Sequence, residues 1–291
     1  MNPGLLGLIT ALCWGTGDFF ARYMSRALGP VQVLIILYIV SVLVLTPLAL
    51  AGDIELLWQP TTLVLSVISG VASAGAATLL YKSLAQGPLG IVVPVTASYP
   101  LPLVLIVMFM GDLNLTFPLA AAISATIGGV WIVARIGYKT EYSEVHAMGT
   151  INSGILLAGS AAIIFAFTFL AMEEAISRSG EVEVIWFSRI ISIVVLLLAL
   201  YIRSGLRIGN IDKKMWMLLI AMGIVDSIGF VALFSAHGTG NTAIASVGSA
   251  AYGVVTVGLA RLVLKEPIKP MQWVGFAIVF AGAAGLTLLS T

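Results

Sequence analysis

The sequence predicts an all-α membrane protein with ten transmembrane helices, arranged as two inverted five-helix repeats around a central cavity. Of the 291 residues, 60% are hydrophobic and 9% are charged, and the mean hydropathy is +1.10. This composition excludes an ordinary soluble domain. Ten apolar runs are each close to the roughly 20 residues that a helix needs to cross a bilayer. The basic residues between these runs give the two halves opposite orientations.

The ten runs follow one another with short connections, and charged residues, prolines or glycines separate them. They cover residues 4–23, 31–51, 61–85, 89–110, 115–136, 149–176, 182–202, 215–238, 242–264 and 270–290. The N-terminus lacks the basic segment of a cleavable signal and leads directly into the first run. The two longest polar connections, 137–148 and 203–214, are too short to form a soluble domain. We therefore expect any functional site to lie between helices.

The basic residues of the connections predict the orientation of the chain. The connections after the odd-numbered helices contain Arg22, Arg26, Lys82, Arg135, Lys139, Arg203, Arg207, Lys213, Lys214, Arg261, Lys265 and Lys269. The opposite connections have only Arg178, with the acidic residues Asp53, Glu55, Asp112 and Glu181. Because basic loops resist translocation, the odd connections should be cytoplasmic. This places both termini on the outer side of the cell membrane.

The same distribution divides the chain into two repeats of opposite orientation. Residues 1–137 form the first repeat, 138–148 a cytoplasmic linker and 149–291 the second repeat. Five helices carry the chain across the membrane, so the second repeat begins from the opposite side. Inverted repeats are a building plan of secondary transporters, whose substrate site lies between the halves near mid-membrane. Chance similarity between apolar helices is the alternative interpretation.

Two stripes of small residues at four-residue intervals lie on the fifth and tenth helices. They are Ala121, Ala125 and Gly129, and Ala277, Ala281 and Gly285. Small residues at this spacing allow helix backbones to approach closely in lipid. We therefore predict that the fifth and tenth helices pack on each other. A homodimer contact is the second interpretation, so the protein would be a monomer or a weak homodimer.

Several short motifs occur in an order that resembles a known family. They are Trp14-Gly15, Gly87-Pro88, Val93-Pro94, Tyr99-Pro100, Gly111-Asp112, Leu264-Lys265-Glu266-Pro267 and Gln272-Trp273-Val274-Gly275. Over nearly its whole length the chain resembles the ten-helix EamA-type members of the drug/metabolite transporter superfamily. The family's usual Gly-Glu turn is Gly111-Asp112 in the first half and Lys265-Glu266 in the second. The resemblance implies a metabolite transporter with a cavity lined by helices one, three, four, six, eight and nine.

Four ionisable residues lie inside predicted spans, where a charge is costly and indicates a functional site. Asp18 and Arg22 are one helical turn apart and share a face with Trp14, so they could pair and reach the cavity. Arg189 and Asp226 lie near the middle of the seventh and eighth helices and could neutralise each other. The functional alternative is that Asp18 or Asp226 binds a proton or a substrate ammonium in one conformation, because burial disfavours an ionised carboxylate.

Aromatic residues recur on the helices expected around the cavity. The candidate substrate-binding residues are Trp14, Tyr81, Tyr99, Phe165, Phe234 and Tyr252, with Phe169 and Phe230 in the same group. Their rings offer apolar faces, polar tips and cation–π contacts to an amphipathic solute. Packing is the alternative role for most of them. Tyr81 and His237, the latter with Phe234, are candidate gates on opposite sides of the membrane.

The remaining chemistry of the sequence favours transport over catalysis. Cys13 is the single cysteine and lies in a span, and we find no metal-ligand cluster, phosphate-binding loop or catalytic triad pattern. We therefore expect no enzyme, cofactor or metal. The net charge of +1 gives no reason to expect a nucleic-acid partner. We predict a secondary transporter that exports a small amphipathic metabolite such as an amino acid by alternating access. Proton antiport through Asp18 is one hypothesis for its coupling, and facilitated diffusion or exchange is the alternative. The rival hypothesis is a non-transporting receptor or assembly protein on the same scaffold.

Overall fold

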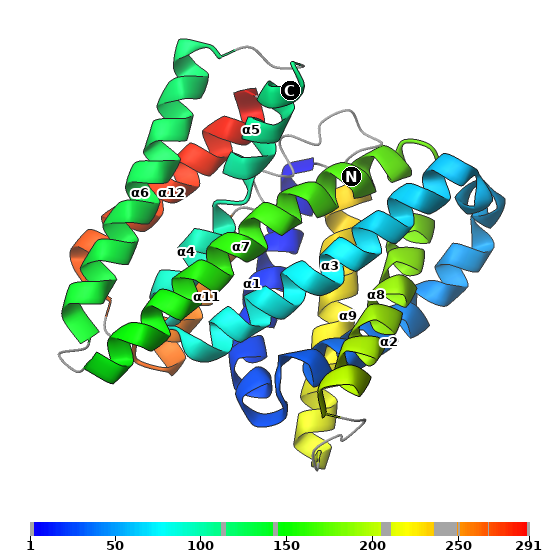
Figure 1. The fold of residues 1–291 in the computed structure, drawn as a ribbon, viewed down its shortest axis with the longest axis horizontal. Coiled ribbons are helices and arrows are strands. Elements are labelled where there is room, and N and C mark those ends of the chain that lie inside the picture. The colour runs from blue at the N-terminus through cyan, green and yellow to red at the C-terminus, as the bar shows by residue number, and fades with distance from the viewer. Residues whose placement is uncertain are drawn as a thin grey trace.

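The structure is a computed structural model that describes residues 3–111, 115–141, 145–204, 211–235, 249, 251–266 and 268–289, and the regular elements within these ranges are helices. The first half contains α1 (Pro3–Leu28), α2 (Pro30–Ala51), the short 3-10 helix η1 (Ile54–Trp58), α3 (Pro60–Gln86), α4 (Leu89–Ala97), α5 (Pro100–Met110) and α6 (Phe117–Glu141). The second half contains α7 (Val145–Ile176), α8 (Glu181–Ser204), α9 (Lys213–Ser235), α11 (Tyr252–Val263) and α12 (Pro270–Leu289). Figure 1 shows their arrangement.

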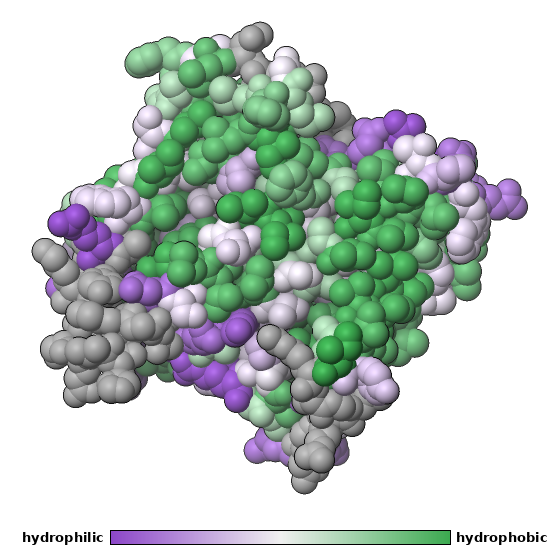
Figure 2. Space-filling view, viewed as in Figure 1, coloured by the Kyte–Doolittle hydropathy of each residue, from purple (hydrophilic) through white to green (hydrophobic). Residues whose placement is uncertain are grey.

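The helices have the lengths and surfaces of membrane spans. Among the described residues, seven segments are long and apolar enough to cross a membrane, and α4 together with α5 counts as one of them. Shorter apolar helices cover Phe117–Val133, Tyr252–Val263 and Pro270–Gly285. Together they match the ten predicted spans in order. Large apolar side chains such as Leu43, Leu156 and Leu198 point outward, and Figure 2 shows hydrophobic residues over much of the visible face. Such a surface suits lipid rather than water.

The contacts between helices recur when each helix of one half is replaced by its counterpart in the other half. α1 packs on α9 and α11, as α7 packs on α3 and α4, and α2 packs on α9 as α8 packs on α3. Helix α2 packs on its own counterpart α8, and α6 packs on its counterpart α12. In Figure 1, α6 lies beside α12 at one edge of the molecule, away from α2, α8 and α9. This pattern is that of two inverted five-helix repeats, as the sequence predicts.

Glycines at equivalent positions of the two halves permit close helix crossings. Gly70 in α3 and Gly223 in α9 are separated by the same number of residues as Tyr99 and Tyr252. A Cβ on Gly70 would lie 2.7 Å from the Ser188 carbonyl oxygen in α8, and one on Gly223 would lie 2.8 Å from the Leu37 carbonyl oxygen in α2. Both distances are too short for a real Cβ. The absence of a side chain therefore fixes the α3–α8 and α2–α9 crossings, which flank the central cavity.

The predicted packing of the fifth on the tenth helix, which are α6 and α12, is confirmed, but the interface uses only part of the predicted stripes. A Cβ on Gly282 would lie 2.4 Å from Thr126 Oγ1, and one on Gly129 would lie 2.7 Å from the Val279 nitrogen. Ala121, Ala277 and Ala281 are exposed on the outer surface. Since one residue turns an α-helix by about 100°, a stripe drawn one residue from the contact line already points away from it. Of the predicted six, Gly129 is buried in the interface and Gly285 faces Ala122.

The predicted fourth span is two helices instead of one. Pro100 lacks the N–H that would continue α4, and the backbone tightens before it into short turns. Ser98 N donates to Val95 O at 3.3 Å and Tyr99 N donates to Thr96 O at 3.1 Å. In the second half, Tyr252 begins α11 directly after a turn at Ala251. The break therefore places Tyr99 at an irregular point of the backbone beside the cavity.

One end of the helix bundle brings three connections together. Arg22, near the end of α1, forms an ion pair with Glu266, which follows α11, with 2.8 Å between Nη1 and Oε1. Arg22 Nη1 also donates to the Gly87 carbonyl between α3 and α4 at 2.9 Å. Arg26 Nε donates to the carbonyl of Ala85 at 2.7 Å. The first, third and ninth connections, which the sequence assigns to one membrane side, thus lie together in the structure.

Candidate transport cavity

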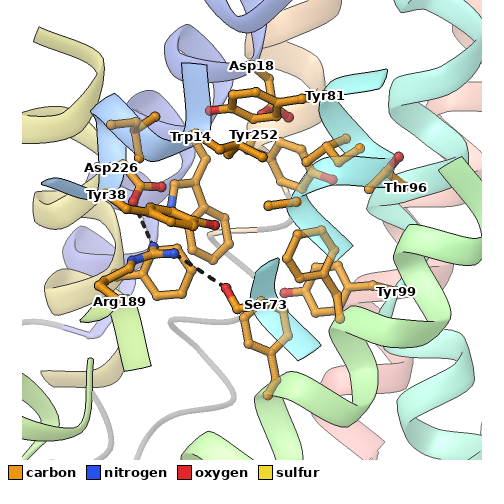
Figure 3. Close-up of a pocket in the computed structure, with 17 residues that line it drawn as sticks. Trp14, Asp18, Tyr38, Ser73, Tyr81, Thr96, Tyr99, Arg189, Asp226 and Tyr252 are labelled. Carbon is orange, nitrogen blue, oxygen red and sulfur yellow. Dashed lines mark hydrogen bonds and ion pairs between the residues drawn. The ribbon is translucent and has the colours of Figure 1, made fainter. Parts of the chain in front are cut away.

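A pocket with an empty volume of about 620 Å³ lies between the two halves. The residues that line it are Trp14, Asp18, Leu34, Leu37, Tyr38, Ser73, Ala77, Leu80, Tyr81, Thr96, Tyr99, Phe165, Phe169, Arg189, Asp226, Phe230 and Tyr252. The family resemblance implies a lining from spans one, three, four, six, eight and nine, which are α1, α3, α4–α5, α7, α9 and α11. Lining residues come from all of these, and also from α2 and α8. The lining is mostly apolar with a few polar groups, as is usual for small-molecule sites. Figure 3 shows these side chains converging on the cavity.

The predicted ion pair between Arg189 and Asp226 is present in the cavity. Arg189 Nη2 lies 2.7 Å from Asp226 Oδ2, and Nη1 lies 3.4 Å from Ser73 Oγ. The guanidinium carbon is 4.3 Å from the ring centroid of Tyr38 and 4.2 Å from that of Phe230. An arginine held by a carboxylate and aromatic faces is stabilised by both interactions. The charge of Arg189 is therefore balanced and its position is fixed by four side chains.

The two partners of Arg189 occupy equivalent positions in the repeats. Ser73 and Asp226 are separated by the same number of residues as Gly70 and Gly223, and lie one turn further along α3 and α9. Each contacts the single arginine from its own half. The scaffold is thus pseudo-symmetric, whereas its charges are not. This asymmetry allows the two halves to carry out different chemistry around one cavity.

Asp18 is the second carboxylate of the cavity. It lies one turn after Trp14 on α1 and its side chain is buried, with 8% of its surface exposed. Among the described residues, no hydrogen bond or ion pair to Asp18 is found. In Figure 3, Asp18 lies with Tyr81 and Tyr252 on the side of the cavity away from Arg189. The described part of the chain therefore leaves its carboxylate for a proton or a solute.

Arg22 has a different place from the one that its spacing suggests. Four residues after Asp18, it pairs with Glu266 instead and is not among the described residues that line the pocket. The side chains of Arg22 and Glu266 are 12% and 11% exposed. Helical spacing allows an Asp18–Arg22 contact, but the Gly87 carbonyl and the Glu266 carboxylate together offer the guanidinium more acceptors. Asp18 and Arg22 therefore belong to two separate features of the structure.

The aromatic residues of the cavity contact one another in a continuous cluster. The ring centroid of Trp14 lies 5.1 Å from Phe230, 6.1 Å from Tyr252 and 6.2 Å from Phe169. Tyr99 in turn lies 5.1 Å from Phe169. Such distances are typical of stacked and edge-to-face pairs. The cluster gives the cavity rigid aromatic surfaces from both halves of the chain.

Five of the six predicted substrate-binding residues line the pocket: Trp14, Tyr81, Tyr99, Phe165 and Tyr252. Phe234 is not among the lining residues and packs 6.3 Å from both Phe169 and Phe230. Of the candidate gates, Tyr81 lines the pocket, and His237 lies outside the described residues. The sequence prediction missed Tyr38, Ser73 and Thr96. Each is a hydroxyl-bearing residue within an apolar span, a signal that could have indicated them.

Comparison with known proteins identifies the family of this chain. The sequence profile of the EamA-like transporter family matches residues 2–135 and again residues 152–288. The chain belongs to the EamA-like transporter family. The two matches coincide closely with the two halves that exchange in the helix contacts. This EamA-like protein is accordingly a multi-pass membrane transporter of the drug/metabolite type.

Two further comparisons found proteins similar to this EamA-like transporter. An uncharacterised protein of Methanocaldococcus jannaschii, MJ1333.1, is 28% identical over 131 residues, which cover 45% of this chain and 94% of that protein. The matched relative thus has about the length of one repeat. A crystal structure superimposes with a TM-score of 0.70 at 19% sequence identity, covering 99% of this chain and 97% of the other. At that identity the superposition shows the shared fold alone.

Proposed function

We propose that this EamA-like transporter is a secondary transporter that exports a small amphipathic metabolite with an amino group by alternating access. The observation that carries the proposal is the cavity between the halves, where the carboxylate of Asp18 lies among aromatic rings. Carboxylates and aromatic faces both attract an ammonium group. Amino acids, aromatic ones included, are the candidate substrates suggested by the sequence.

Alternating access is supported by the way the two halves share the cavity. Lining residues come from both repeats, so a rearrangement of one against the other would change the opening of the site. Residues 1–137 and 149–291 would act as the two units, with 138–148 as a cytoplasmic linker and both termini outside the cell membrane. The closely packed α6–α12 pair would serve as the fixed base. Tyr81 would contribute to one gate.

We propose proton coupling through Asp18, and its lack of a partner among the described residues supports this role. An ionised carboxylate in an apolar environment is costly unless something neutralises it. A proton and a substrate ammonium can each do so, but not at the same time. If Asp18 binds either a proton or the substrate but never both, each transport cycle would exchange protons for substrate. Asp18 is asymmetric in this role, because the corresponding turn of α7, around Thr168, carries no acid.

Flux in proteoliposomes tests the proposed function. Purified protein is reconstituted and assayed with radiolabelled amino acids, simple amines, sugars and nucleosides, with and without a pH gradient. We expect saturable uptake of an amine-bearing solute, accelerated by a proton gradient in the antiport direction. Absence of flux for the whole panel, with correctly folded protein, would instead favour a receptor or an assembly protein. Asp53→Asn is the matched control for the variant Asp18→Asn in this assay, because Asp53 lies outside the cavity, between α2 and η1.

A further inference from the structure

The charges that line the cavity do not match those of an amino acid. Among the described lining residues, the ionisable carboxylates are Asp18 and Asp226, and Arg189 is the single base. Arg189 and Asp226 neutralise each other at 2.7 Å. Ionised Asp18 therefore leaves the site with one unbalanced negative charge. A zwitterion would need a cation for its carboxylate as well as an anion for its ammonium.

Arg189 is poorly placed to bind a substrate carboxylate. Its side chain is 4% exposed, whereas that of its partner Asp226 is 20% exposed. Tyr38 and Phe230 contact the guanidinium, and Ser73 lies beside Nη1. Its Nε is buried and has no hydrogen-bond partner in the described part of the chain, so it offers no accessible donor. The ion pair therefore presents mainly its carboxylate to the cavity.

The surroundings of Asp18 suit an organic cation. The rings of Trp14 and Tyr252 contact each other on the Asp18 side of the cavity, and Tyr81 lies on the same side in Figure 3. An ammonium group placed there would meet one carboxylate and the faces of several electron-rich rings. The apolar side chains of Leu34, Leu37 and Leu80 line the same pocket and could receive a hydrocarbon body. No part of this arrangement requires a substrate carboxylate.

We infer that the cavity binds organic monocations, amines without a carboxylate, in preference to amino acids. Asp18 pairs with the substrate ammonium, and Arg189 is a positioning residue that holds Asp226, Tyr38 and Phe230. The inference rests on the proposed function, in which this cavity is the transport site. It narrows the substrate class from amphipathic amines in general to those that carry a single positive charge.

Binding to the purified protein tests this inference without depending on flux. The three probes phenethylamine, phenylalanine and phenylacetate share an aromatic ring and differ in their charged groups. Isothermal titration in detergent or nanodiscs should show phenethylamine binding at least tenfold more tightly than phenylalanine, with phenylacetate weakest. Equal or tighter binding of phenylalanine would overturn the inference, as would binding of phenylacetate at a similar affinity. Failure of all three probes, with saturable binding of an amino acid, would overturn it too.

Two variants assign the roles of the charges. Asp18→Asn should weaken phenethylamine binding at least tenfold and should not weaken any binding of phenylacetate, because it removes a charge that repels a carboxylate. Asp226→Asn should release Arg189, so that binding of phenylalanine and phenylacetate improves relative to phenethylamine. If Asp226→Asn does not fold, the ratio among the three probes on the wild-type protein still decides. Tight phenethylamine binding without flux would contradict the transporter proposal and support the monocation site. Flux of amino acids alone would support the transporter proposal and contradict the monocation site.

Discussion

Arg22 and Glu266 form an ion pair across the two halves of the chain, with 2.8 Å between Nη1 and Oε1. Arg22 belongs to α1, and Glu266 follows α11. Both side chains are nearly buried, at 12% and 11% exposure. Gly90 N lies 3.4 Å from the other carboxylate oxygen of Glu266. A single carboxylate therefore holds the end of α1, the start of α4 and the α11–α12 connection together.

Glu266→Gln should destabilise the protein, because it removes the carboxylate that lies 2.8 Å from the nearly buried guanidinium of Arg22. Breaking such a pair costs about 3 kcal/mol. The midpoint of thermal unfolding in detergent, followed by light scattering or size exclusion, would measure the loss. The double variant Arg22→Met with Glu266→Gln should recover part of it, because no charge is then left unpaired.

Arg178→Gln is the matched control for that experiment. Arg178 follows the end of α7 and pairs with Glu174 in the last turn of that helix, but the two side chains are 47% and 51% exposed. Exposed pairs of this kind contribute about 0.5 kcal/mol or less. The unfolding midpoint should therefore change little. Equal losses for Glu266→Gln and Arg178→Gln would show that the Arg22–Glu266 pair has no special role in stability.

Gly282→Leu should disrupt the α6–α12 interface. A Cβ at this position already meets Thr126 Oγ1 at 2.4 Å, so a larger side chain forces the helices apart. Overpacking of this kind costs about 1–3 kcal/mol or more. We expect lower yield of monodisperse protein and a lower unfolding midpoint. Ala277→Leu, on the exposed face of the same helix, should be tolerated. A larger fall in the unfolding midpoint for Ala277→Leu than for Gly282→Leu would contradict this assignment of the interface.

The apparent affinity for an amine substrate should fall as pH falls, because protonated Asp18 cannot pair with an ammonium group. The Arg189–Asp226 pair, Tyr38, Tyr81, Tyr99 and Tyr252 are the other charged or titratable groups of the described cavity. Initial rates of uptake over a series of pH values would measure the effect. Asp18→Asn should remove the pH dependence together with any acceleration by a proton gradient. A pH dependence that survives in this variant would remove Asp18 from the coupling mechanism.

Pro100→Ala should weaken substrate binding more than it lowers stability. Alanine restores an N–H at the α4–α5 break and permits a continuous helix, which would rotate Tyr99 away from the cavity. Binding of phenethylamine and the unfolding midpoint can be measured on the same preparation. Pro47→Ala, within α2 and outside the set of lining residues, is the control. Similar binding by both variants would show that the break does not position the site.

Helix number and repeat structure could be predicted from the sequence because they depend on local properties. The thickness of a bilayer sets the length of each apolar run, and charges and prolines mark where each run ends. Trp14, Tyr99 and Tyr252 could be predicted as cavity residues because the family resemblance implies which helices line the cavity, and these aromatic side chains occur on them. The Arg189–Asp226 pair could be predicted because each would otherwise be an uncompensated charge in an apolar environment.

Partner choice and the exact contact faces were decided by the tertiary structure. Asp18 and Arg22 have the spacing of a helical pair, yet Glu266, more than two hundred residues away, binds Arg22 instead. Ala277 and Gly282 lie on one helix rich in small residues, and only the position of α6 determines which of them is buried. A sequence states which contacts a helix permits. Only the packed structure decides among them, because it brings in competing partners from distant segments.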